Sequence, residues 1–86
     1  MSKHGKRLSR LFSKPKDFTW SEAVAVLNSL GYDRVSSGSS HEKFVNRNDK
    51  ADVYFACRPH PGNELKEYQV RNLCRFLTEK GHEPDA

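Results

Sequence analysis

The sequence contains little of what stabilises disulfide-rich, metal-binding or membrane proteins. It has two cysteines, Cys57 and Cys74, without CxxC spacing, which argues against a disulfide framework or a zinc site and predicts buried or half-buried free thiols. The four histidines are scattered without a carboxylate cluster, so we expect no metal and no cofactor. No apolar run approaches the roughly 18 residues of a membrane span, and the N-terminus lacks the apolar stretch of a secretory signal. We therefore expect a soluble, cytoplasmic protein that does not associate with membranes.

The basic residues are concentrated at the N-terminus. Residues 1–16 carry six lysines and arginines and no acid, a charge of +6, whereas residues 17–86 carry nine basic and eleven acidic residues, a charge of −2. We predict that residues 1–16 form a flexible basic extension, which either attracts polyanions without reading their sequence or is solvated without a specific role. Leu8, Leu11 and Phe12 would form an apolar stripe if this segment became a short helix, which is marginal in water unless it docks.

The rest of the chain predicts one small domain over residues 17–81, followed by a frayed C-terminus at 82–86. A length of 86 residues excludes a two-domain enzyme, a barrel or a dinucleotide fold. The apolar spacing and the turn residues predict a helix at 20–30, strands at 32–37, 41–47 and 51–58, and a helix at about 66–80.

Local sequence patterns mark where the predicted elements begin and end. Thr19 and Glu22 form a capping box at the start of the first helix, and Gly31 suits its C-terminal end. Val35 is the expected apolar anchor of the first strand. The second helix carries an apolar stripe and is expected to end at Gly81. The stripe residues are Val70, Leu73, Cys74 and Leu77.

These elements predict an α+β fold in the order α-β-β-β-α. Short connections favour consecutive hairpins, so the strands form a three-stranded antiparallel sheet with both helices on one face, a two-layer sandwich. The other face stays open to water or a ligand. Strict alternation assigns the two faces. We expect Glu42, Phe44, Val53, Phe55 and Cys57 on the helix side, and His41, Lys43, Val45, Arg47, Tyr54, Ala56 and Arg58 on the open side.

The predicted open face combines cations, a tyrosine and a histidine. Lys43, Arg47 and Arg58 would suit a phosphate backbone, and Tyr54 would suit an unstacked base, although both sets also fit an ordinary solvated sheet. His41 could act as a general acid or base, because an unperturbed imidazole titrates near pH 6.5. The face is thus a candidate RNA site.

Four segments, in this order and at suitable spacing, resemble the HicA toxins of bacterial toxin–antitoxin pairs. The resemblance covers about residues 18–81. The second segment is similar to the family's Gly-Ser-His-x-x-Phe pattern, except that Ser39 stands where the family has glycine and Gly38 lies one residue earlier. The four segments are Leu30-Gly31-Tyr32, Ser40-His41-Glu42-Lys43-Phe44, Pro59-His60-Pro61-Gly62-Asn63-Glu64-Leu65-Lys66, and Val70-Arg71-Asn72-Leu73 followed by Gly81.

The resemblance implies a fold like the double-stranded-RNA-binding domain and an endoribonuclease that cleaves mRNA and is silenced by a HicB-like antitoxin. It also implies that His41 is the catalytic residue. Ser40 and His60 are possible auxiliary residues.

Two other function classes remain open from the sequence. One is a non-catalytic RNA-binding module of the same fold, and the other is an interaction domain without ribonuclease activity. Double-stranded-RNA binders of this shape carry a lysine cluster at the start of the second helix. Here that position offers Lys66 as an RNA contact, flanked by Glu64 and Glu67, which weakens the binding-module reading.

Overall fold

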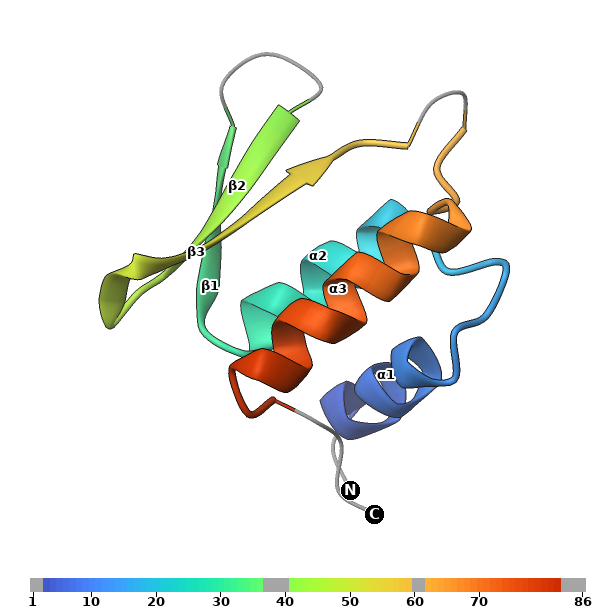
Figure 1. Ribbon diagram of the computed structural model, residues 1–86, viewed down its shortest axis with the longest axis horizontal. Coiled ribbons are helices and arrows are strands. Elements are labelled where there is room, and N and C mark those ends of the chain that lie inside the picture. Colours follow the sequence, from blue (N-terminus) through green and yellow to red (C-terminus); the bar gives the residue numbers. More distant parts are fainter. Residues whose placement is uncertain (1–2, 37–40, 60–61, 83–86) are drawn as a thin grey trace.

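The computed structural model describes residues 3–36, 41–59 and 62–82, and it has three layers. A three-stranded antiparallel sheet in the order β1-β2-β3 is covered on one face by α2 and α3, and α1 lies beyond these helices, away from the sheet (Figure 1). The predicted α+β order is confirmed, with one helix added in front. The elements are α1 (Lys3–Phe12), α2 (Trp20–Ser29), β1 (Tyr32–Ser36), β2 (His41–Asn46), β3 (Asp49–Cys57) and α3 (Glu67–Glu79).

The predicted capping box at the start of α2 is present. The Glu22 backbone N–H donates to the Thr19 hydroxyl at 3.2 Å, and the Thr19 N–H donates to the Glu22 carboxylate at 3.1 Å. These bonds satisfy backbone donors that an isolated helix leaves free. Gly31 has a φ of +94° directly after the helix, a conformation that favours glycine. The chain can therefore turn at once into β1.

The sheet register reverses the predicted faces of β3. From His41 to Val45, β2 pairs regularly with β3, for example Phe44 with Tyr54 and Lys43 with Phe55. After Val45 the register shifts, because Asn46 pairs with Asp49. This irregularity shifts the pairing of β3 against β2 by three residues. Because side chains alternate between the two faces of a strand, a shift by an odd number exchanges the faces of β3.

The alternation predicted for β2 is therefore confirmed and that for β3 is wrong. Glu42 and Phe44 are buried on the helix side, and His41 and Lys43 are exposed on the open side. The prediction for Val35 is also wrong, since this residue is 43% exposed. Tyr32 is the fully buried anchor of β1 instead. On β3, Tyr54 and Ala56 lie on the helix side with Phe44 and Glu42, whereas Val53, Phe55 and Cys57 lie on the open side with Val45, Lys43 and His41.

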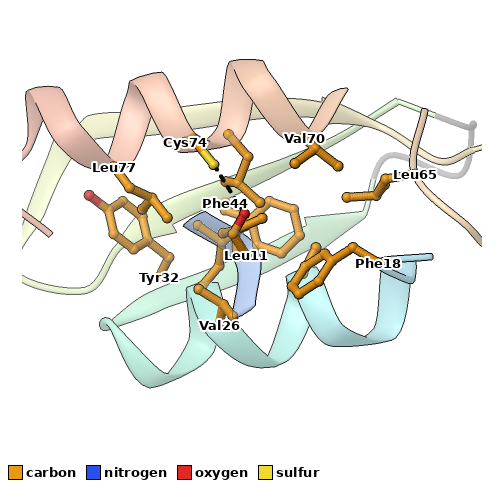
Figure 2. Packing of buried hydrophobic residues seen from close by; sticks show 12 residues of the cluster. Leu11, Phe18, Val26, Tyr32, Phe44, Leu65, Val70, Cys74 and Leu77 are labelled. Carbon is orange, nitrogen blue, oxygen red and sulfur yellow. Dashed lines mark hydrogen bonds between the residues drawn. The ribbon is translucent and has the colours of Figure 1, made fainter. Parts of the chain in front are cut away.

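The core lies between the sheet, α2 and α3 (Figure 2). Phe44 enters it from the middle strand and lies 5.9 Å, centroid to centroid, from the Trp20 ring. The predicted stripe of α3 is buried as expected, and Cys74 belongs to it while Cys57 is half-buried. The largest fully buried side chains are Tyr32, Phe18, Phe44, Leu11, Leu27, Leu77, Val26 and Val70.

The predicted flexible extension is a helix in the structure. Leu11 of α1 is completely buried in the common core, and Leu8 and Phe12 pack against it. Arg10 fixes the helix from outside, donating to Glu22 at 2.6 Å and to Asp17 at 2.7 Å. The apolar stripe docks on α2 and α3, and this packing supplies what a ten-residue helix lacks in water.

A buried polar network joins the three strands to the C-terminal end of α3. Asp52 accepts hydrogen bonds from the Tyr32 hydroxyl at 2.6 Å and from Asn46 at 3.0 Å, and Lys80 lies 3.4 Å from it. Burial raises the pKa of the Asp52 carboxyl, but these three donors outweigh it and hold the pKa below its usual range. Burial, with the hydrogen bond to Asp52, also raises the pKa of Tyr32.

The docking of α1 can be tested with Leu11→Ala. Removing a fully buried leucine costs about 2–5 kcal/mol of unfolding free energy. We expect a loss of that size in urea denaturation followed by circular dichroism. Ser9→Ala, an exposed change on the same helix, is the control and should stay within about 0.5 kcal/mol of the parent. A Leu11→Ala protein as stable as this control would show that α1 does not contribute to the folded domain.

The Asp52 network predicts an acid-dependent loss of stability. Because the folded-state pKa of Asp52 is depressed, its contribution is complete above the unfolded-state pKa and is lost as pH falls toward the folded-state value. Tyr32→Phe removes one donor, so we expect it to cost about 1.5–3 kcal/mol at about pH 5 and clearly less at about pH 3. Urea unfolding at both pH values measures this. Exposed Tyr68→Phe is the control, and an equal loss for Tyr32→Phe at both pH values would contradict the prediction.

Candidate nucleic-acid interface on the open sheet face

The open face of the sheet is built in rungs of directly paired residues. One rung holds Val35, Lys43 and Phe55, one from each strand, and the next toward the end of the sheet holds His41 opposite Cys57. His41 begins β2, and its side chain is exposed. The candidate catalytic histidine and Lys43 are therefore neighbours on one solvent-facing surface, as the alternation of β2 predicts.

A buried carboxylate on the opposite face fixes the strand that carries His41. Glu42 points to the helix side with a fully buried side chain, where it meets Arg34 of β1 at 2.8 Å and Arg58 just after β3. Both arginines are partly exposed, so they keep some water while they neutralise the carboxylate. This clamp joins all three strands next to His41, and it orients the histidine outward because neighbouring residues of a strand alternate.

Two of the predicted RNA contacts lie on the helix side of the sheet. Tyr54 packs against Phe76 of α3, with ring centroids 4.6 Å apart and the ring planes tilted by 42°. Burial, with a smaller effect of Cys74, raises the pKa of Tyr54 to about 12. Arg58 is bound to Glu42. The register shift at the start of β3 explains both corrections, and neither side chain joins His41 on the open face.

The other predicted RNA contacts lie in two places. Arg47 is exposed at the turn after β2 and donates to Asp33 at 2.9 Å. Lys66 lies at the start of α3, away from the open face, where its backbone N–H donates to Gln69 at 2.8 Å. Gln69 in turn donates to the Cys57 carbonyl at 2.9 Å, which ties the end of β3 to α3.

Lys66 lines a basic groove that the sequence did not reveal. The groove lies between the segment after α1 and the start of α3, and Leu65 and Val70 contribute apolar surface to it. Its charged residues are four cations and one acid, and the acid, Glu67, is paired with Arg71 at 3.1 Å. The four cations are Lys14, Lys16, Lys66 and Arg71.

Two of the predicted site residues, Ser40 and His60, lie outside the described residues. Within residues 3–36, 41–59 and 62–82, no three histidine, cysteine or acidic side chains come together as a metal-binding group. In the same part of the chain, no helix combines the length and apolar character needed to cross a membrane.

The sequence prediction missed the most exposed aromatic residue of the site. Phe55 is 76% exposed in the middle of β3, although alternation placed it in the core. The available signal was the pair Tyr54-Phe55, of which only one ring can face the helices. The prediction placed Phe55 on the inner face with Val53 and Cys57, and Tyr54 on the open face. Instead its ring is covered by Phe76, and the phenylalanine remains in water.

The importance of the clamp can be tested with Glu42→Gln. The amide keeps the shape but loses the charge that holds two arginines, so we expect a loss of about 1–3 kcal/mol in unfolding free energy. Glu67→Gln breaks an exposed pair one turn apart on α3 and should cost at most about 0.5 kcal/mol. Urea denaturation compares them. Equal stability of the two variants would mean that the clamp does not hold the sheet together.

One comparison with known proteins identifies the family. The family model described as the HicA toxin of bacterial toxin–antitoxin systems matches residues 20–77, from the start of α2 to near the end of α3. Helix α1 lies outside this match. No curated protein and no solved structure was found to match the chain. Because the matched residues form well over half of the sequence, the chain belongs to the HicA toxin family.

Proposed function

We propose that this protein is an endoribonuclease toxin that cleaves mRNA with His41 and is neutralised by a HicB-like antitoxin. The observation that carries the proposal is the position of His41. It begins the central strand of the sheet and is exposed on the open face beside Lys43. Membership in the HicA family supports a toxin of a toxin–antitoxin pair.

The chemistry requires an acid or base near a phosphodiester and positive charge around it. His41 would remove the proton of a ribose 2′-hydroxyl or protonate the departing 5′-oxygen, and either role is worth roughly 10²–10⁴ in rate. Lys43, two residues along the strand, would stabilise the negative charge that grows on the phosphate. Phosphoryl oxygens need such a cation most in the transition state, so the lysine would act on rate as well as on binding.

The basic groove supports contact with the RNA backbone. It is also the observation that favours the alternative function, a non-catalytic RNA-binding module. Lys14 and Lys16 come from the segment outside the family match, and they line the same groove as Lys66 and Arg71. Closely spaced cations bind phosphates with little regard to sequence. A protein that used only this groove would bind RNA without cutting it.

An antitoxin would neutralise the protein most directly by covering His41 or the approach to it. This follows from the geometry of an open sheet face, where a partner that lies across the strands would cover the site. We expect His41→Ala to remove toxicity while binding of the antitoxin is largely kept, since a single exposed side chain contributes only part of an interface.

The function is tested by incubating a purified mRNA with the protein and with His41→Ala, in EDTA. We expect cleavage by the parent and a loss of at least about 10²-fold in the variant. Asn72→Ala, an exposed change on α3, is the control and should cut normally, and circular dichroism checks that all three proteins fold. RNA bound but not cut by the parent would favour the binding module. Equal cleavage by the parent and folded His41→Ala would remove His41 from the mechanism.

A further inference from the structure

Phe55 is a large apolar residue that the sheet register turns into water on the open face. The residue lies within β3, and 76% of its surface is open to water. An isolated exposed apolar residue is ordinary, but Phe55 is not isolated. Val35, 43% exposed, lies on the same rung with only Lys43 between them. The middle of the open face is therefore an aromatic and aliphatic surface divided by a cation.

The register places this surface beside His41. Lys43 is directly opposite Phe55, and His41 is directly opposite Cys57, one rung away. Diagonal neighbours across antiparallel strands lie about 7–8 Å apart, within reach of an aromatic side chain. Val35, His41, Lys43, Phe55 and Cys57 also line one shallow hollow on the sheet. A ligand on Phe55 would thus extend to the candidate catalytic histidine.

The charges around the hollow favour a single-stranded nucleic acid over other occupants. A second hollow continues along the same face past Lys43, and it is lined by Arg47 and Lys50. Asp33, an acid on this face, is paired with Arg47. Exposed rings interleaved with cations are how proteins bind unpaired strands, since every base has a face that can stack and every linkage carries a charge. Duplex RNA would keep its bases stacked inside the helix.

We propose that Phe55 is the base-stacking platform of the site and that the substrate must be unpaired where it is cut. The ring takes the face of one nucleobase, and Lys43 contacts a neighbouring phosphate, which brings the linkage to be cleaved to His41. This inference rests on the proposed ribonuclease function. Phe55 is a substrate-positioning residue in this arrangement, and it takes no part in proton transfer.

The proposal is tested by RNA binding in a His41→Ala background, where the RNA stays intact. The probe is a short single-stranded RNA carrying 2-aminopurine, whose fluorescence is quenched when its ring stacks. Phe55→Leu keeps an apolar side chain and removes the ring, so we expect the Kd to rise about 5- to 150-fold and the quenching to disappear. Phe55→Tyr keeps the ring and should bind within about twofold of the parent. Thr78→Ala, an exposed change on α3 outside the hollow, is the control and should bind within about twofold of the parent.

The outcomes separate this inference from the function on which it rests. Because the Phe55 ring is mostly in water, its variants should fold, and circular dichroism verifies this. Binding and quenching by Phe55→Leu equal to those of the parent would overturn the inference and point to a protein partner for the surface. Cleavage of mRNA by a Phe55→Leu protein that retains His41, at the rate of the unmodified protein, would also overturn the inference. It would leave the role of His41 and the ribonuclease function in place. If the protein with His41 intact binds the probe with quenching but cuts no RNA, the ribonuclease function is overturned and the stacking role is supported.

Discussion

The candidate site depends on a carboxylate that is buried between two arginines. Glu42 carries a charge into the helix side of the sheet, where an uncompensated carboxylate would cost several kcal/mol. Arg34 and Arg58 compensate it from the two flanking strands, so all three strands are joined at one point. Because successive residues of a strand face opposite ways, this arrangement also determines that His41 faces solvent. A charge pair on one side of the sheet thus orients the candidate catalytic residue on the other.

The second constraint on the site is the irregular pairing where β3 begins. The shift after Val45 allows Asp52 to reach Tyr32 and Asn46 in the interior, and it places Tyr54 under Phe76. The same shift turns Phe55 outward. Its exposure is therefore a consequence of satisfying a buried carboxylate and a buried ring elsewhere on the strand, and the open face gains an aromatic surface next to Lys43.

These two constraints explain which parts of the structure could be predicted from the sequence. Short-range patterns predict both domain helices, their caps and the faces of β2. For β2, the apolar side chain of Phe44 was enough to orient His41 and Lys43. The faces of β3 do not, since a shift in register depends on contacts between residues distant in sequence, such as Tyr32 with Asp52. Helix α1 was missed for a related reason. The six basic residues of residues 1–16, with no acid among them, suggested a solvated tail, whereas Leu11 finds its partners only in the assembled core.

The charge of the open face likewise differs from what composition indicates. Residues 17–86 carry a net charge of −2, which favours some reliance on a partner or on the N-terminal segment for RNA affinity. Two of the acids in residues 17–86, however, are not presented on the open face. Glu42 and Asp52 are buried on the helix side and paired there. The N-terminal segment is not uniformly free either, since Arg10 is engaged by two acids of the domain. The open face itself presents exposed cations to a polyanion, with Lys43 opposite the Phe55 ring and Lys50 in the second hollow farther along the face, even though the domain as a whole has an excess of acids.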